Sequence, residues 1–165
     1  MKTLLLVRHA KSSWDNSSLN DFDRPLNERG QRDAPVMAKR LLDRKIAIDA
    51  FVSSPAKRAK KTAELFIKEF GAKKDAIIFH EDLYGAIPEN FYKVIGDVDN
   101  NYESIALFSH NPGITDFASG LTNARIDEMP TCAIFAVKIH TDKWSEFETA
   151  AKEFWFFDYP KSDTG

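Results

Sequence analysis

Short apolar runs alternate with amphipathic stretches along the 165 residues of the chain. Buried strands of a parallel sheet are apolar over most of their length, so these runs predict strands. The predicted strands are 2–7, 50–53, 76–79, 104–109, 133–139 and one around 154–157. Strands that alternate with helices are typical of an α/β fold, and we expect a three-layer α/β/α arrangement with a mostly parallel sheet.

The amphipathic stretches predict four helices between these strands. They run from Asn27 or a neighbouring cap towards Arg44, from Pro55 to about Phe70, from Pro88 to Ile95 and from Pro112 to about Leu121. Pro35 lacks a backbone donor, so we expect it to interrupt or kink the first helix. The segment 10–26 is polar and long for a loop, which is often a sign of function. No linker divides the chain, and we expect one domain over 1–165.

Three predicted strands end in residues that can bind an anion. Arg8 and His9 follow the first strand, Arg58 lies just after the second, and His110 follows the fourth. The carboxyl ends of parallel strands meet at one crevice, where ligands bind in open α/β sheets. Arginines can hold phosphate oxygens bidentately, and an imidazole beside a held phosphoryl group is a competent nucleophile. The sequence therefore predicts a phosphate site at this edge of the sheet.

Two predicted helix starts add to that site. Ser54 before Pro55, and Asn111 before Pro112, are typical of an N-cap followed by proline at the first helical position. Free backbone N–H groups at a helix start favour an anion. We also expect a carboxylate or a backbone carbonyl to hold the second ring nitrogen of His9, because this fixes its tautomer.

Four segments carry motifs in a characteristic order. They are Leu6-Val7-Arg8-His9-Ala10-Lys11, Arg24-Pro25-Leu26-Asn27-Glu28-Arg29-Gly30, Ser53-Ser54-Pro55-Ala56-Lys57-Arg58-Ala59-Lys60-Lys61-Thr62-Ala63 and Phe108-Ser109-His110-Asn111-Pro112. Together they resemble the histidine phosphatase superfamily in its phosphoglycerate-mutase-like branch. The resemblance implies that His9 is transiently phosphorylated and that Arg8, Arg58 and His110 complete the phosphate-binding core. It also implies that neither a metal nor another cofactor is needed.

Within that superfamily the chain is most similar to the SixA-type phosphohistidine phosphatases. The similarity rests on its short length and on residues 8–12 and 83–86. In many relatives an Asn follows the Trp of the first loop and touches phosphate, whereas here Asp15 follows Trp14. A carboxylate would repel phosphate, so we expect Asp15 to face away or to hold a neighbour. Asn16 or Ser12 would then supply the contact, and Asn111 is a further candidate for substrate binding.

The leaving-group side departs from the pattern of the branch. Mutases and ester phosphatases there carry an acidic residue shortly after the third strand, and alignment on Leu83 puts Gly85 at that position. Glu81, Asp82 and Glu89 are nearby but out of register. Protonation of a leaving alkoxide is worth about 10²–10⁴-fold. An imidazole can be protonated before its bond to phosphorus breaks, so this departure favours phosphohistidine in proteins as the substrate.

Composition limits the kinds of binding partner that we expect. The formal net charge of −2 and the lack of a long apolar run predict no nucleic-acid partner and no membrane partner. The N-terminal apolar stretch is too short for a signal peptide and Cys132 is the only cysteine, so we expect a cytoplasmic protein. The expected partner is a phosphorylated protein or a small phosphate-containing substrate.

Other phosphatase chemistries fit less well. A cysteine phosphatase needs Arg six positions after the cysteine, where this chain has Lys138, so we expect Cys132 in the core. The paired aspartates Asp21 and Asp23 follow no apolar strand, unlike those of haloacid-dehalogenase-type phosphatases. A metal site at His9 and His110 would place a cation beside two arginines, and the chain has no His-x-x-x-His or Cys-x-x-Cys spacing.

Three functions are therefore weighed. The first is a metal-independent phosphatase acting on protein phosphohistidine through His9. The second is a broad-specificity small-molecule phosphomonoester phosphatase or a mutase of the same superfamily, although a mutase needs substrate-gripping insertions that this compact chain lacks. The third is a non-catalytic module that binds phosphoproteins, which would require a damaged core.

Overall fold

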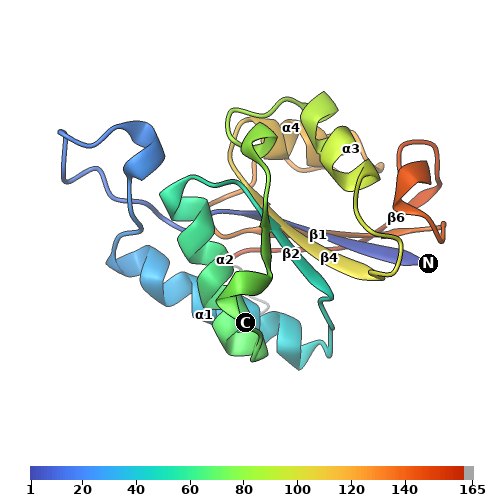
Figure 1. The fold of residues 1–165 in the computed structure, drawn as a ribbon, viewed down its shortest axis with the longest axis horizontal. Helices are drawn as coiled ribbons and strands as arrows, with labels where there is room; N and C mark the ends of the chain where they lie inside the picture. The colour runs from blue at the N-terminus through green and yellow to red at the C-terminus, as the bar shows by residue number, and fades with distance from the viewer. Residues whose placement is uncertain (162–165) are drawn as a thin grey trace.

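Six strands form one sheet in the order β3-β2-β4-β1-β5-β6 in the computed structural model, which describes residues 1–161 (Figure 1). The strands are β1 (Lys2–Arg8), β2 (Ala50–Ser53), β3 (Ile77–Phe79), β4 (Ser104–Ser109), β5 (Ile134–Ile139) and β6 (Lys152–Asp158). β3, β2, β4 and β1 are parallel neighbours, β5 is antiparallel to β1, and β6 is antiparallel to β5. The mostly parallel sheet predicted from the sequence is confirmed. Residues 162–165 of the expected domain lie outside the described part.

Helices cover both faces of this sheet. On one face lie α1 (Glu28–Asp43) and α2 (Lys57–Phe70), and on the other lie α3 (Pro88–Gly96) and α4 (Gly113–Ser119) (Figure 1). Short 3₁₀ turns occupy the connections at η1 (Asp21–Asp23), η2 (Lys74–Ala76), η3 (Glu81–Leu83) and η4 (Trp144–Glu146). This is the expected three-layer α/β/α arrangement. Within residues 1–161 no helix is long and apolar enough to cross a membrane.

The central strand β1 shows why its sequence is apolar without interruption. Leu4 and Leu6 belong to the core that α3 and α4 cover, whereas Leu5 and Val7 belong to the core under α1 and α2. Successive side chains of a strand point to opposite faces, and here both faces are buried. The packing on both sides fixes where β1 ends, and therefore where the residue after it lies.

The first helix differs from its prediction at Pro35. α1 is continuous from residue 28 to residue 43, so an interruption at Pro35 is wrong, whereas a kink there stays a prediction. The missing donor of a proline inside a helix costs about 3 kcal/mol. The buried face of α1, which includes Met37, Ala38 and Leu41, offsets that cost, since burying each large apolar side chain is worth about 1.5–3 kcal/mol.

The start of α1 is docked against the loop that follows β1. Asn27 is the N-cap as expected, and its side chain accepts a hydrogen bond from Gly30 N at 2.9 Å. The backbone N–H of Asn27 donates to Lys11 O at 3.0 Å. A Cβ on Gly30 would collide with this same Lys11 carbonyl, so only glycine allows the approach.

The predicted starts of two other helices are wrong. α2 begins at Lys57 with Ala56 at its N-cap, and α4 begins at Gly113 with Pro112 at its N-cap. Ser54 and Asn111 therefore cap neither helix. Their side chains are used in the site instead, where they hold other groups of the strand ends.

Candidate active site

The parallel strands bring the predicted core residues to one edge of the sheet. Arg8 at the end of β1 is in register with Ser109 at the end of β4, so His9 and His110 follow side by side. The backbone N–H of His9 donates to Ser109 O at 3.1 Å, and the two imidazole centroids lie 5.1 Å apart. In Figure 1 the loop after β1, drawn in blue, extends beyond this edge of the sheet.

His9 is held in one tautomer. Its Nδ1 lies 2.7 Å from the carbonyl oxygen of Ala10, which can only accept a hydrogen bond, so Nδ1 carries the proton. The other nitrogen, Nε2, accepts a hydrogen bond from Arg58 Nε at 3.3 Å. Nε2 therefore keeps its lone pair, as a nucleophile requires. Of the two groups expected to hold His9, the backbone carbonyl is the one found.

Burial keeps both imidazoles neutral. Burial lowers the pKa of His9 well below its usual 6.5, and the nearby His110, Arg58 and Arg8 lower it further against the opposing hydrogen bond to Ala10. For His110, burial followed by the charge of Arg58 lowers the pKa to about 3. At neutral pH, His9 is therefore already in its unprotonated form.

Arg58 lies in the first turn of α2 and only 6% of its surface is exposed. One turn later, the Thr62 hydroxyl donates to Arg58 O at 2.7 Å and accepts a hydrogen bond from Ala10 N at 2.9 Å. Thr62 thus ties the start of α2 to the residue after His9. This tie sets the Arg58 guanidinium beside His9.

Arg8 and His110 each have an unused hydrogen-bonding atom. Arg8 Nη1 donates to Met129 O at 2.9 Å, while Arg8 Nε is buried without a partner among residues 1–161. His110 Nδ1 is likewise buried and unpartnered there. Ser54 Oγ accepts a hydrogen bond from Ala56 N at 3.2 Å and lies 2.7 Å from His110 Nε2.

This pattern assigns a role to Ser54. The Ser54 hydroxyl is buried and has no other acceptor among residues 1–161, so its hydrogen is directed at His110 Nε2, and the ring proton of the neutral His110 is then on Nδ1. His110 Nδ1–H and Arg8 Nε–H are both donors. Together with Arg58, they can bind the oxygens of a phosphoryl group held in front of His9 Nε2.

The three further residues expected to touch substrate lie in different surroundings. Ser12 is buried, and its hydroxyl accepts a hydrogen bond from Arg24 Nη2 at 2.5 Å. Asn111 donates to Met129 O at 3.0 Å, the carbonyl that also holds Arg8. Asn16 is exposed, and its side chain accepts hydrogen bonds from the backbone and hydroxyl of Ser18. Their contacts with substrate stay a prediction.

A cluster that the sequence analysis missed lies at the entrance of the site. The carboxylate of Asp21 in η1 accepts hydrogen bonds from Tyr84 Oη at 2.7 Å, Arg58 Nη2 at 2.9 Å and Arg24 Nη1 at 3.0 Å. The backbone carbonyl of Asp21 also accepts from Arg58 Nη1, at 2.6 Å. Partial burial works to raise the pKa of Asp21, but these three side-chain donors hold it well below its usual range.

Tyr84 and Trp14 frame this entrance. The Tyr84 ring stands edge-on to His110 with 5.5 Å between centroids, and Arg24 lies 3.2 Å from the centroid of the Trp14 ring. Asp15 is exposed. The sequence held one signal for the cluster, because Asp21 precedes Arg24 by three residues beside the Arg-Pro-Leu motif.

The position expected for a general acid has a distinctive backbone. Gly85 has φ +67°, in the left-handed region that favours glycine, and the space around it is open. Of the substitutes considered, Glu81 and Asp82 are exposed in η3, where Asp82 lies 3.9 Å from Lys93. Glu89 borders a separate hollow beside Trp144.

The backbone of Cys132 holds the backbone of His9. Its backbone N–H donates to His9 O at 3.0 Å, and its thiol is fully buried, as expected of a core residue. Burial raises the pKa of this thiol far above its usual value. Over residues 1–161, no group of three or more His, Cys, Asp or Glu side chains could hold a metal ion. Metal independence itself stays a prediction.

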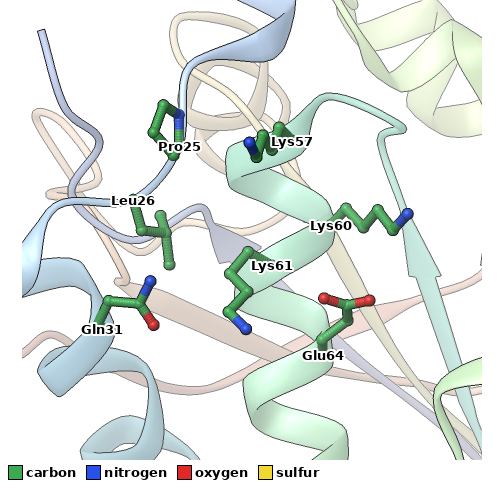
Figure 2. Close-up of a pocket in the computed structure, with 7 residues that line it drawn as sticks. All are labelled: Pro25, Leu26, Gln31, Lys57, Lys60, Lys61 and Glu64. Carbon is green, nitrogen blue, oxygen red and sulfur yellow. The ribbon is translucent and has the colours of Figure 1, made fainter. Parts of the chain in front are cut away.

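A basic hollow includes Lys57, which precedes Arg58 in the first turn of α2, and Pro25, which follows Arg24. It has a volume of about 330 Å³ and is lined by Pro25, Leu26, Gln31, Lys57, Lys60, Lys61 and Glu64. Figure 2 shows Lys57 and Lys61 on the side of α2 towards Pro25 and Leu26, whereas Lys60 points away. Because Lys57 directly precedes Arg58, the hollow begins next to the site.

The fold and this site define a class of protein: an α/β domain with a neutral histidine beside two arginines and a second histidine at the carboxyl ends of parallel strands. Residues 4–85 match the model of the Histidine phosphatase superfamily (branch 1), and the chain belongs to this superfamily. The family expected from the four motifs is thereby confirmed.

Similar proteins span most of the chain. An uncharacterised chloroplastic protein of Arabidopsis thaliana is 29% identical over 153 residues, covering 88% of this chain and 70% of its own. A candidate phosphohistidine phosphatase, SixA of Agrobacterium tumefaciens, has 25% identity and a TM-score of 0.81, with 96% and 98% of the two chains covered. A mycobacterial glucosyl-3-phosphoglycerate phosphatase shares the fold at 14% identity and a TM-score of 0.74, with coverages of 96% and 100%.

Proposed function

We propose that this phosphatase hydrolyses phosphohistidine in proteins and that His9 carries the phosphoryl group between two half-reactions. The observation that carries the proposal is the state of His9. Its Nδ1 donates its proton to a hydrogen bond with Ala10 O, and its unprotonated Nε2 accepts a hydrogen bond from Arg58 Nε at 3.3 Å. A preorganised neutral imidazole of this kind needs no base before it attacks phosphorus.

In the first half-reaction, the lone pair of His9 Nε2 forms a bond to phosphorus while the bond from phosphorus to the leaving nitrogen breaks. The electron pair of the broken bond goes to the leaving imidazole. Arg8, Arg58 and the Nδ1–H of His110 bind the phosphoryl oxygens, on which negative charge is spread in the transition state. His9 becomes an imidazolium that bears the phosphoryl group on Nε2 and the proton on Nδ1, where Ala10 O stabilises the positive charge.

In the second half-reaction, the oxygen of a water molecule forms a bond to phosphorus and the bond to His9 Nε2 breaks. The electron pair returns to Nε2, a proton of the attacking water passes to another oxygen of the same phosphoryl group, and inorganic phosphate leaves as H₂PO₄⁻. His9 is restored in its starting tautomer, because Nδ1 keeps its proton throughout.

The leaving-group side supports a phosphoramidate over an ester. Gly85 stands where esterases of the branch have an acid, and its left-handed backbone disfavours a side chain there. The likeness to SixA of Agrobacterium tumefaciens points the same way. The alternative of a small-molecule phosphomonoester substrate is favoured by the shared fold of the glucosyl-3-phosphoglycerate phosphatase. The mutase and the non-catalytic binding module are further alternatives, and the cytoplasmic location stays a prediction.

One comparison of substrates tests the proposal. Three substrates are compared: a peptide or protein that carries phosphohistidine, the small molecule phosphoimidazole, and an alkyl phosphate. Hydrolysis of each is measured with the wild-type protein and with a His9→Ala variant, in the presence and in the absence of a chelator. We expect wild-type hydrolysis of the two phosphoramidates, much slower hydrolysis of the alkyl phosphate, and no effect of the chelator. Comparable rates on all three substrates would contradict the phosphohistidine preference. Binding without turnover would favour the binding module.

A further inference from the structure

The Asp21 carboxylate lies at the mouth of the site, one guanidinium away from the nucleophile. Arg58 Nε contacts His9 Nε2 at 3.3 Å, and Arg58 Nη2 contacts Asp21 Oδ2 at 2.9 Å. In an in-line displacement the leaving group lies beyond phosphorus from His9 Nε2, on the side of the ring that faces away from Ala10 O, and Arg58 connects this side to the partly exposed Asp21. Asp21 is thus a charged group on the leaving side of the reaction.

The carboxylate still has an acceptor position. Three side chains donate to it, namely Arg24, Arg58 and Tyr84, whereas an ionised carboxylate offers about four lone-pair sites. The Asp21 side chain is 49% exposed, so the remaining site is open to solvent at the entrance. A substrate with an N–H group in this place can donate to it.

The charge of Asp21 selects among leaving groups. The donors from Arg24, Arg58 and Tyr84 keep the carboxyl ionised at neutral pH, so it cannot supply a proton to an alkoxide. It repels a leaving group that gathers negative charge and attracts one that is cationic. A phosphohistidine ring that is protonated on its second nitrogen is such a cation.

We propose that Asp21 is a specificity-determining residue that accepts a hydrogen bond from the protonated second ring nitrogen of the substrate phosphohistidine. This inference rests on the proposed function and deepens it. When the bond between phosphorus and the first ring nitrogen breaks, its electron pair goes to that nitrogen, and the ring leaves as neutral imidazole with its N–H retained. No general acid is needed, because the proton that makes the ring a good leaving group is already on it.

The same interaction predicts a pH signature. Asp21 stabilises the protonated form of the ring of the bound substrate. The ring therefore keeps its proton to a higher pH, and hydrolysis continues there. The charged groups that face Asp21 are Arg24 from the same loop and Arg58 from α2, and Tyr84 faces it from the loop after η3. His110 lies behind Tyr84, and none of these groups can replace the negative charge of Asp21.

An Asp21→Asn variant tests the inference, with Asp23→Asn as the matched control in the same 3₁₀ turn. The kcat/KM values for phosphoimidazole and for p-nitrophenyl phosphate are measured across pH, because nitrophenolate leaves without protonation. We expect the ratio of phosphoimidazole to p-nitrophenyl phosphate to fall about tenfold in Asp21→Asn, equivalent to one pKa unit of lost selectivity. The basic limb with phosphoimidazole should also move to lower pH, and the Asp23→Asn ratio should equal that of the wild type.

Other outcomes separate this inference from the proposed function. An equal loss on both substrates in Asp21→Asn would mean that Asp21 only anchors Arg58, and would overturn the inference. An unchanged ratio with an unchanged basic limb would overturn it as well. If the wild-type protein itself fails to hydrolyse phosphoimidazole but cleaves phosphate esters, the proposed function is wrong. Thermal unfolding of the variant shows whether a loss reflects folding instead.

Discussion

The site has an inner half and an entrance, and they are built by different means. In the inner half, His9 and Arg58 are each 6% exposed and His110 is 7% exposed. At the entrance, the Asp21 side chain is 49% exposed and Trp14 is 72% exposed. The inner residues are positioned by strand ends, the start of α2 and backbone hydrogen bonds. The entrance is held by side-chain contacts between a loop and its neighbours.

This difference separates the chemistry from the choice of substrate. The strand ends cannot shift without disturbing the two apolar cores on either face of the sheet, so the fold sets the geometry of the groups that we propose bind the phosphoryl group. Loop residues can change at little cost to the cores. Substitutions in the inner half should therefore affect every substrate alike, whereas substitutions at the entrance should change one substrate relative to another.

The largest expected effect comes from the centre of the inner half. His9→Ala should lower kcat by about 10⁴-fold or more on every substrate, a loss comparable with that of the nucleophile in other covalent hydrolases. Mass spectrometry of the denatured protein after rapid mixing with phosphoimidazole should find the added phosphoryl group in the wild type only. If His9→Ala still hydrolysed one class of substrate, the inner half would not act on every substrate alike, which would contradict the difference drawn between the inner half and the entrance.

The next largest effect is expected for the guanidinium beside the nucleophile. Arg58→Ala should lower kcat/KM about 10²–10³-fold, the usual cost of removing one donor to transition-state charge. Arg58→Lys should recover only part of this, because an ammonium cannot contact both His9 and Asp21 as the planar fork does. If an Arg58 variant lost activity towards phosphoimidazole alone, Arg58 would act on the choice of substrate, as the entrance residues are expected to do.

A pH profile tests the neutral state of the inner half. With an ordinary pKa of about 6.5, only about a tenth of His9 would be unprotonated at pH 5.5, and activity would fall about tenfold from its plateau. Because burial lowers the pKa of His9, its nucleophilic form persists as the pH falls, and we expect a much smaller loss. NMR titration of the His9 ring proton checks the assignment. A midpoint near pH 6.5 would contradict it.

The smallest expected effect concerns the basic hollow next to the entrance. Lys57→Glu combined with Lys61→Glu should lower kcat/KM on an acidic phosphohistidine protein by roughly threefold to tenfold at low salt, because exposed charges mainly steer association. Lys39→Glu on α1 is a matched control in an exposed position. An equal loss on phosphoimidazole would show that the hollow does not distinguish protein substrates from small ones.

The inner half was largely predictable from sequence because its determinants are local. Arg8 ends an apolar strand, and His9 and His110 directly follow such strands, whose ends parallel neighbours align. Arg58 lies in the helix that follows β2. The helix starts at Ser54 and Asn111 were not predictable in the same way. Ser54 can cap a helix or hold an imidazole, and the choice depends on His110, which lies 56 residues away.

The entrance was missed for a related reason. The Asp21 carboxylate is defined by Arg58 and Tyr84, which are 37 and 63 residues away, and no periodic pattern links such positions. Pro35 shows the same limit in a helix. Its local cost was correctly recognised, but the packing that offsets this cost belongs to the assembled core.

The position of Cys132 has a consequence for chemistry under oxidising conditions. The chain's one thiol sits behind His9, sealed from solvent and kept protonated, so peroxides and alkylating agents meet no thiolate there. Hydrolases that attack through cysteine lose their nucleophile to the same reagents. If His9 is the nucleophile, as we propose, the catalytic cycle uses an imidazole and leaves the buried sulfur out, so we expect activity to be independent of the redox state of the surroundings.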